Sequence, residues 1–278
     1  MNKTRSLHVA VAQIHSGGSI ESTLQRVGQQ IAAASAVGAE LILFSECALH
    51  GYDYDMTPAS VRAVAQPVEG SHCRKIHELA EQHRISVLIG FFENDAGSIF
   101  NSMLIARPGE SLRTARKHVL TESELFAEIT PGRREREVVE INGVRCALII
   151  CADGGMEGLS EDLQRQGVDY RLCPTGGGGK MADMLRAHEL QSPEGRSRYT
   201  NNRPRVFNVA PILSETDCPF SGFASANALG PVGHQTFHQG HCMIVDNQRV
   251  MRAQIPGTIV LEHMQDQMVH AVLAFEKN

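Results

Sequence analysis

Three strand-like runs in this chain each lead to a side chain that can take part in catalysis. The runs begin at residues 41, 113 and 148, and they lead to Glu46, Lys117 and Cys151. The first and third are almost wholly apolar, which is typical of strands buried on both faces of a sheet. Parallel neighbouring strands place their carboxyl ends at one edge of a sheet. If these strands are neighbours, the carboxylate, the amine and the thiol are expected to converge there.

Strand-like runs alternate with helical spacing of apolar residues along most of the 278 residues. Helices are predicted at Ile20–Val37, Ser71–Arg84, Gly158–Gln166 and Met181–Leu190. Strands are predicted at Leu7–Ile14, Glu40–Phe44, Ile85–Phe92, Asn101–Ala106, Ser111–Lys117, Val138–Ile141, Cys146–Ile150, Tyr170–Pro174, Val206–Ile212, Ala224–Ala228, His241–Val245, Arg249–Gln254 and Val269–Ala274. Neither a repeat nor a break in composition divides the chain. We therefore expect a single α/β domain over residues 1–278, with helices outside large sheets.

Charge and cysteine usage exclude several classes of protein. The net charge is −5 and no polybasic tract is present, so binding to nucleic acid or to an acidic membrane has no electrostatic support. No apolar segment approaches the roughly 20 residues that a membrane-spanning helix needs. The seven cysteines are scattered without CxxC pairs, which argues against a disulfide framework or a zinc ribbon. This pattern indicates a reducing compartment, and we expect a cytoplasmic protein.

The three strand-end side chains complement one another chemically. A carboxylate at the depth of a strand end has a raised pKa and can serve as a general base. A nearby ammonium favours a thiolate and stabilises an oxyanion. Taken alone, Glu46 could be an acid at a helix start, Lys117 a surface charge and Cys151 an inert buried thiol. Their order and their matching contexts favour a catalytic triad.

The segments around these residues resemble three motifs of the nitrilase superfamily of carbon–nitrogen hydrolases. Leu43-Phe-Ser-Glu-Cys-Ala-Leu-His-Gly-Tyr52 resembles its glutamate motif. Arg116-Lys-His-Val-Leu120, with a downstream Thr-Pro-Gly132, resembles its lysine motif. Ile149-Ile-Cys-Ala-Asp153, followed by a helix, resembles its cysteine motif. The resemblance covers nearly the whole chain.

The resemblance implies a four-layer αββα sandwich and a Glu-Lys-Cys triad. Cys151 would be the nucleophile, Glu46 the general base and Lys117 the group that stabilises the tetrahedral intermediate, helped by the backbone N–H of Ala152. A thioester acyl-enzyme would form on Cys151 and be hydrolysed by water. The resemblance also implies a small-molecule amide or nitrile substrate, no metal or organic cofactor, and a homodimer or higher homo-oligomer.

Many family members carry a second glutamate between the lysine and the cysteine. The chain offers Glu122, Glu124 and Glu128 for this position. Counting between Lys117 and the downstream Pro-Gly favours Glu124. The alternative is that all three belong to a solvated helical turn.

Four residues are expected to bind substrate. Tyr52 and Tyr54 follow Glu46 closely and could form a pocket wall, with core packing as the alternative; Asp153 and Thr175 are expected beside the thiol. Typical nitrilases place Trp-Glu after the cysteine, whereas Ala-Asp follows it here and resembles the amidase form. An amidase is therefore favoured over a nitrilase acting on a small nitrile, an N-carbamoyl hydrolase and a non-catalytic binding module. A papain-like enzyme is disfavoured because its cysteine context is absent.

The chain departs from the family pattern mainly at residues 175–205, the region that shapes the substrate pocket in the family. There is no tryptophan, Asn201-Asn202 stands where the family usually has Glu-Asn, and His241 replaces a small residue. Gly176–Lys180 lacks the Ser or Thr of a phosphate-binding loop, so we expect a mobile loop at a pocket. Two groups have open interpretations. A carboxylate on the substrate could be recognised by Arg196, Arg198, Arg203 and Arg205, or these residues could lie in a solvated loop or a subunit contact. A metal site is disfavoured for the other group, which consists of His234, His238, His241 and Cys242.

Overall fold

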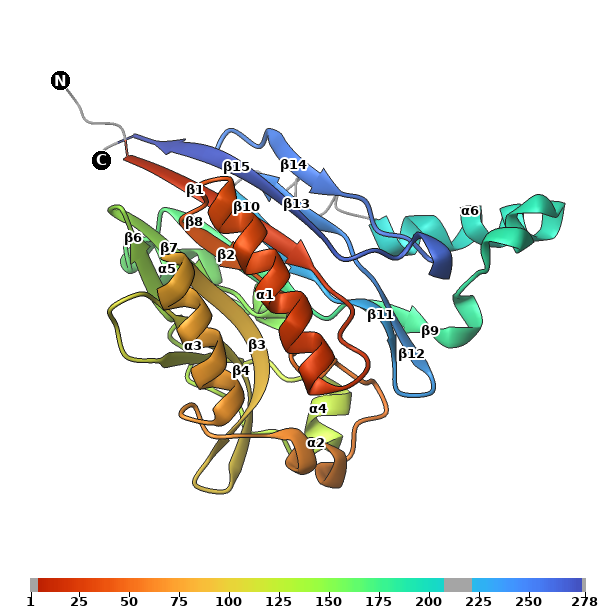
Figure 1. Cartoon of the computed structure of the whole chain (residues 1–278), viewed down its shortest axis with the longest axis horizontal. Coiled ribbons are helices and arrows are strands. Elements are labelled where there is room, and N and C mark those ends of the chain that lie inside the picture. The colour runs from red at the N-terminus through yellow and green to blue at the C-terminus, as the bar shows by residue number, and fades with distance from the viewer. Residues whose placement is uncertain (1–4, 208–221, 277–278) are drawn as a thin grey trace.

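Two six-stranded sheets pack face to face in the computed structural model, which describes residues 5–207 and 222–276 (Figure 1). The first sheet has the order β15 (Gln267–Phe275), β1 (Arg5–Gln13), β2 (Leu41–Leu43), β3 (Ser86–Asp95), β4 (Ser98–Ala106), β5 (Arg113–Arg116). The second has the order β14 (Met251–Ile255), β13 (Cys242–Val245), β10 (Phe223–Asn227), β8 (Tyr170–Thr175), β7 (Val144–Leu148), β6 (Val138–Ile141). The central strands β1–β2–β3 and β7–β8–β10 are parallel. Each sheet therefore gathers the ends of its parallel strands at one edge.

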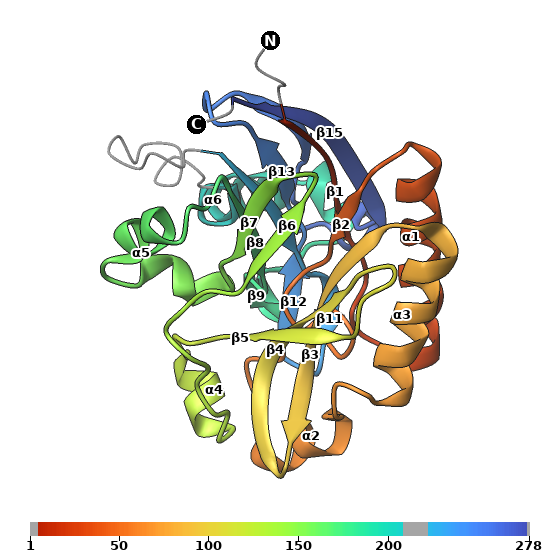
Figure 2. The same ribbon diagram turned by 90° about the vertical axis from the view of Figure 1, so that its left-hand side faces the viewer.

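Helices cover the outer faces of both sheets (Figure 2). Helices α1 (Ile20–Ala36) and α3 (Ser71–His83) cover the first sheet, and α5 (Leu159–Arg165) covers the second. The other helices of the described residues are α2 (Pro58–Val64), α4 (Glu122–Phe126) and α6 (Pro193–Phe207). Side chains such as Val27 and Ile76 of α1 and α3 pack against Ile42 of the first sheet, and Leu163 of α5 packs against Ile149 beyond β7. The core between the sheets is wholly apolar at its centre. The predicted four-layer αββα sandwich is thus confirmed.

The β2 segment illustrates why the apolar runs form central strands. All three of its residues are buried, because the strand pairs with β1 and β3 and is covered on both faces.

Ser19 caps the start of helix α1, and its hydroxyl accepts a hydrogen bond from the backbone N–H of Ser22. The predicted boundaries of α1, α3 and α5 agree with the structure to within one or two residues.

The sequence-based expectations fail mostly between residues 176 and 207. Gly178–Lys180 forms strand β9 of a small sheet with β11 (Leu229–Val232) and β12 (Thr236–Gln239), so the expected mobile loop is largely a strand. The helix expected at Met181–Leu190 is replaced by two 3₁₀ turns, η2 (Met181–Asp183) and η3 (Ala187–Gln191). Between them Leu185 bridges to Val260, which holds this part of the backbone extended.

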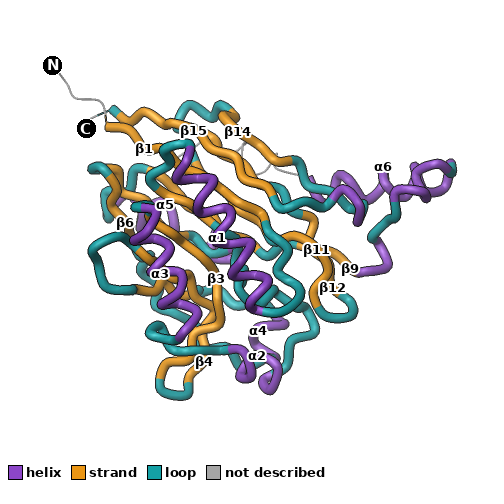
Figure 3. The backbone as a smooth tube through the Cα atoms, viewed as in Figure 1, coloured by secondary structure: helices purple, strands orange, loops and turns teal. Residues whose placement is uncertain are grey.

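The basic segment expected as a loop forms helix α6, which projects from the body of the molecule (Figure 3). The Ser192 hydroxyl accepts a hydrogen bond from the N–H of Gly195, and Pro193 is the first helical residue, a position where its missing N–H costs little. The strand predicted at Val206–Ile212 starts inside this helix, and its remaining residues lie outside those described. None of the helices within residues 5–207 and 222–276 has the length and apolar character that crossing a membrane requires.

Candidate active site

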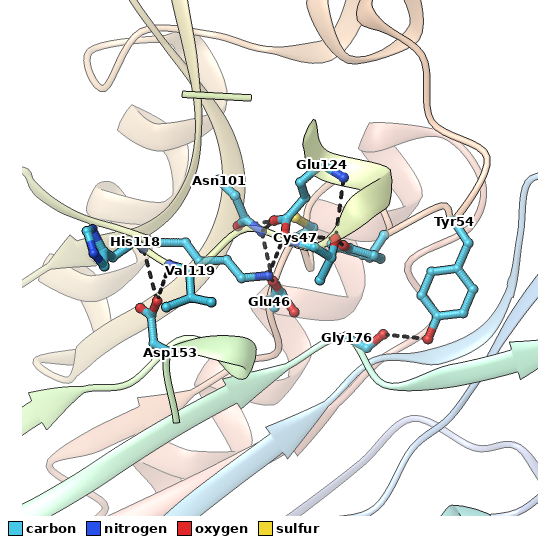
Figure 4. A network of polar contacts seen from close by, with 12 residues as sticks. Glu46, Cys47, Tyr54, Asn101, His118, Val119, Glu124, Asp153 and Gly176 are labelled. Carbon is cyan, nitrogen blue, oxygen red and sulfur yellow. Dashed lines mark hydrogen bonds and ion pairs between the residues drawn. The ribbon is translucent and has the colours of Figure 1, made fainter. Parts of the chain in front are cut away.

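Four polar side chains form a buried cluster at the edge of the first sheet (Figure 4). The Lys117 ammonium donates to Glu46 Oε1 at 2.6 Å and to Glu124 Oε2 at 2.8 Å. Asn101 of β4 donates from Nδ2 to both carboxylates, at 2.8 Å and 2.6 Å. Each of the four side chains is at most 1% exposed. We call Glu46, Asn101, Lys117 and Glu124 the charged cluster.

The cluster alters the pKa values of its members. Burial would lower the pKa of the Lys117 ammonium, but the charges of Glu46 and Glu124 outweigh burial and the pKa is raised, so lysine remains a cation. Burial, helped by the charge of Glu124, raises the pKa of Glu46 against the pull of Lys117. Glu46 Oε1 has two donors, whereas Oε2 accepts from no nitrogen or oxygen donor among the described residues, and a hydrogen bond between the Glu46 side chain and the Cys151 thiol contributes to the raised pKa of that thiol. One oxygen of this carboxylate is therefore open to accept a proton.

Of the three candidates for a second glutamate, only Glu124 enters the cluster. It lies at the third position of α4, where it completes a capping box with Thr121 and is fully buried. Glu122 and Glu128 are exposed. The preference for Glu124 thus agrees with where these side chains lie.

Asn101 is the member of the cluster that sequence analysis did not identify. Besides its two amide donations, its backbone carbonyl accepts the N–H of Lys117 at 2.8 Å, and its side-chain oxygen accepts the Cys47 thiol at 3.4 Å. The available signal was a carboxamide within the apolar strand Ser98–Ala106, because a buried amide needs partners. Asn101 positions both the glutamate and the lysine.

Two glycines allow the backbone segments of the cluster to approach each other. A Cβ at Gly90 of β3 would lie 2.2 Å from the backbone nitrogen of Cys47, and one at Gly132 would lie 2.5 Å from the carbonyl oxygen of Arg116. The N–H of Gly132 donates to the carbonyl of Lys117 at 2.7 Å. The Pro-Gly of the lysine motif therefore holds the lysine backbone.

Cys151 lies on the second sheet, at the start of the 3₁₀ turn η1 (Cys151–Gly155) that follows β7. Its φ of 48° is in the left-handed region, an uncommon conformation for a residue with a side chain. We call η1 the cysteine turn. The expectation of a sharp turn directly after the apolar strand agrees with this geometry.

The environment of Cys151 keeps its thiol protonated at rest. Burial raises its pKa to about 12, and the charge of Glu46 acts in the same direction, while Lys117 and a hydrogen bond from the Gly176 backbone oppose them. A Cβ at Gly176 would lie 2.9 Å from Glu46 Oε2, so only a glycine leaves this oxygen uncrowded. A thiol in this state needs a base to become a nucleophile. Cys47, in contrast, is fully buried and bonded to Asn101.

Asp153 does not line the substrate side of the cysteine turn as expected. Its Oδ1 accepts the backbone N–H groups of His118 at 3.0 Å and Val119 at 2.7 Å, and its Oδ2 pairs with the buried Arg136. The carboxylate is fully buried and both oxygens are occupied. The expectation is therefore corrected: Asp153 ties the cysteine turn to the segment after Lys117.

The two tyrosines contact the glycine-rich segment and the cluster. The Tyr52 ring centroid is 5.5 Å from the Lys117 ammonium, and its hydroxyl is 2.6 Å from that of Thr121. The half-exposed Tyr54 hydroxyl accepts the N–H of Gly178 at 2.8 Å. Tyr52 is thus mainly a packing residue beside the site, and Tyr54 holds its rim.

Thr175, at the end of β8, borders a cavity together with Cys151. Within the described residues, no group of three or more His, Cys, Asp and Glu side chains is arranged to hold a metal ion. His238 is buried, with ring nitrogens 2.7 Å and 3.3 Å from the carbonyl oxygens of Tyr52 and Gly177. His241 Nε2 lies 3.0 Å from the side-chain amide of Gln254.

The basic residues of α6 bind their own surroundings. Arg198 pairs with Glu189 at 2.8 Å, and Arg196 donates to the carbonyls of Leu190 and Gln191. The side chains of Arg203 and Arg205 lie outside those described. The structure brings neither Arg196 nor Arg198 to the charged cluster.

Comparisons with known proteins identify the family of the chain. A model of the carbon–nitrogen hydrolase family matches residues 8–196. A hydrolase from Mycobacterium tuberculosis is 30% identical over 181 residues, which are 62% of this chain and 62% of that protein's length. An (R)-stereoselective amidase from Pseudomonas is 29% identical over 165 residues, covering 57% of this chain and 58% of the amidase.

Solved structures share the fold. A mutant of the Nesterenkonia AN1 amidase of the nitrilase superfamily superposes with a TM-score of 0.68 at 17% identity, covering 95% of this chain and 90% of that chain. A carbon–nitrogen hydrolase from Helicobacter pylori superposes with a TM-score of 0.72 at 15% identity, covering 96% and 89%. The chain belongs to the carbon–nitrogen hydrolase family.

Proposed function

We propose that this protein is a cysteine-dependent amidase that cleaves the carbon–nitrogen bond of a small, non-peptide amide. The observation that carries the proposal is the open oxygen of Glu46. One oxygen is held by Lys117 and Asn101, the other has no nitrogen or oxygen donor among the described residues, and the protonated Cys151 thiol interacts with this carboxylate. This is the arrangement that a general base and its nucleophile require.

The proposed reaction has two halves. Glu46 takes the proton of the Cys151 thiol as the sulfur attacks the amide carbon, and the ammonium of Lys117 with the N–H of Ala152 stabilises the resulting oxyanion. Glu46 then returns the proton to the departing nitrogen, so that ammonia or an amine leaves and a thioester remains. Water, deprotonated by Glu46, attacks the thioester carbon. The bond between that carbon and the Cys151 sulfur then breaks, Glu46 returns its proton to the sulfur, and the carboxylic acid leaves.

Glu124 and Asn101 act in this scheme through Lys117 and Glu46. Their hydrogen bonds hold the lysine charged and fix the direction of the Glu46 carboxylate. Because the cluster is buried, an ammonium there stabilises an oxyanion more strongly than it would in water. Glu124 is thus proposed as a positioning residue for the triad.

An amidase is favoured over a nitrilase by the residues after the nucleophile. Ala152 and Asp153 resemble the amidase form, and Asp153 has a structural role in this chain. An arylacetonitrilase from Aspergillus niger is also similar, at 31% identity over 143 residues, or 48% of this chain. Nitrile hydrolysis is therefore the second candidate, and N-carbamoyl hydrolysis is a third outcome for the same test.

Ammonia release from matched amides, nitriles and N-carbamoyl amines tests the reaction, with intact-mass detection of the thioester. We expect turnover of amides and a thioester in the wild type, and neither in Cys151→Ala nor in Glu46→Gln, because the protonated thiol of the second variant lacks its base. Cys146→Ala, which removes a buried thiol of the core between the sheets, is the matched control and should retain turnover. An adduct that forms equally in Cys151→Ala would overturn the assignment of the nucleophile. Absence of turnover on every panel would favour a binding module.

We also propose that the chain forms one domain that assembles as a homodimer or larger homo-oligomer in the cytoplasm. The family resemblance supports the assembly, and the scattered cysteines support the compartment. Sedimentation velocity of the full chain tests the assembly, and a monomer at micromolar concentration would contradict it.

A further inference from the structure

A cavity of about 140 Å³ adjoins the proposed nucleophile on the outer side of the second sheet. Cys151 and Thr175 border it, and Gly154 of the cysteine turn adds a wall without a side chain. Its other lining residues are Ile149, Leu159, Arg171, Cys173, Phe223 and Ser225. None of the triad partners on the first sheet lines it.

The alternation of side chains along the strands explains why the cavity lies at this place. Leu172 and Ala224 point into the core between the sheets, so their neighbours Cys173 and Phe223 point outward. Helix α5 covers the outward side chains and contributes Leu159. Gly154 of the cysteine turn and Leu159 at the start of α5 both line the cavity.

The lining decides which chemical group fits. Ile149, Leu159 and Phe223 are apolar, and each is at most 8% exposed. Among the described residues that line the cavity only Arg171 is charged, and its guanidinium carbon lies 5.9 Å from the centre of the Phe223 ring. A cavity of roughly 150 Å³ lined by Leu, Ile and Phe side chains is known to take up benzene. The space here therefore suits an uncharged group of up to about the size of a benzene ring.

We propose that this cavity receives the acyl substituent of the substrate, and that the substrates are carboxamides with a compact apolar acyl group. The inference rests on the proposed function, because it requires acyl transfer to Cys151. Ile149, Leu159 and Phe223 then determine specificity without taking part in the chemistry.

The test compares kcat/KM of the full-length protein for acetamide, isobutyramide, benzamide and succinamate. We expect isobutyramide or benzamide to exceed acetamide roughly tenfold or more, because each methylene in an apolar pocket contributes a factor of this order. Succinamate, which carries a carboxylate, should be the poorest. In Leu159→Phe the preference for the bulkier amides should fall about tenfold, and in Leu159→Ala it should move toward benzamide. Val272→Ala shortens an exposed aliphatic side chain and is the matched control.

A second measurement separates the pocket from the reaction. Benzamide should slow the alkylation of Cys151 by iodoacetamide more than acetamide does, as followed by peptide mass mapping, and Leu159→Phe should remove this difference. Protection of Cys151 from alkylation without any ammonia release would refute the proposed function but would still support the cavity as a binding site. Turnover with no dependence on acyl size, or with succinamate preferred, would refute the pocket and leave the amidase standing. Thermal unfolding of each variant verifies that it is folded.

Discussion

The charged cluster and the cysteine turn occupy facing edges of the two sheets, and they are held in opposite ways. Every side chain of the cluster is buried and bonded to another member. The cysteine turn is a short 3₁₀ segment without a side-chain cap, and its first residue has a positive φ. The cluster depends on complementary charges, whereas the turn depends on backbone geometry.

This difference predicts which substitutions reduce both stability and activity and which reduce activity alone. Removing one member of the cluster leaves a buried charge or amide without a partner, so it should affect folding as well as activity. Removing the Cys151 sulfur leaves no charge unpaired and should affect the chemistry alone. Asp153 is the link between the two regions, because it starts from the turn and binds the backbone that follows Lys117.

The strongest test of this contrast is Lys117→Met. The change leaves Glu46 and Glu124 buried together without a cation, so we expect the free energy of unfolding to fall by about 3–5 kcal/mol and hydrolysis to fall to background. Cys151→Ala should also abolish hydrolysis, but with a stability change of at most about 1 kcal/mol. Urea unfolding at neutral pH measures both. Equal losses of stability in the two variants would contradict the contrast.

Asp153→Asn tests the link between the regions. Asparagine can accept from the backbone but lacks the charge that pairs with Arg136, so we expect a loss of about 1.5–3 kcal/mol in unfolding free energy. Activity should fall as well, because Lys117 is positioned by the segment that Asp153 holds. Asp55→Asn, which removes an exposed carboxylate, is the control and should change stability by less than about 0.5 kcal/mol. Full activity in Asp153→Asn would show that the link is dispensable.

Local patterns were sufficient to predict that Glu46 and Cys151 follow buried strands, because their runs are apolar. Lys117 follows β5, an edge strand that is antiparallel to β4 and mostly half-buried, so its place beside Glu46 depends on the assembled sheet. Local patterns also could not identify Asn101 as a member of the cluster. Ser102 is an equally polar and buried neighbour in the same strand, but its hydroxyl donates to Glu93. Which of the two reaches the cluster depends on the face that β4 turns toward it, and that is a property of the assembled sheet.

Asp153 and the segment after Thr175 show the same limit. A 3₁₀ turn, closed by the N–H of Asp153 on the carbonyl of Ile150, carries the carboxylate away from the thiol. The pairing of β9 with β12 and the bridge from Leu185 to Val260 join residues more than fifty positions apart. Helical periodicity cannot anticipate contacts of that range, which override local propensity.

The pH dependence of activity tests whether Glu46 of the charged cluster acts as the base. Glu46 must be ionised to act as a base, and its pKa is raised above the ordinary value of 4.5. The acid limb of kcat/KM should therefore lie above pH 4.5, with activity falling about tenfold per pH unit below the midpoint. The charge of Glu124 contributes to raising this pKa, so Glu124→Gln should move the limb to lower pH. A limb that stays in place or moves upward would contradict the assignment of the base, provided that circular dichroism shows a folded protein throughout.

The smallest expected effect is that of Tyr54→Phe, on the side of the cysteine turn. The hydroxyl accepts the N–H of Gly178 at 2.8 Å and thereby holds the segment whose Gly176 backbone donates to Cys151. Because Tyr54 is 37% exposed, water can replace the lost acceptor, and we expect a stability loss of only about 0.5–1.5 kcal/mol. Activity should fall a few-fold, since the Gly176 backbone is a hydrogen-bond partner of Cys151, the proposed nucleophile. Tyr199→Phe on α6 is the control, and an equal loss of activity there would remove the reason to assign Tyr54 a positioning role.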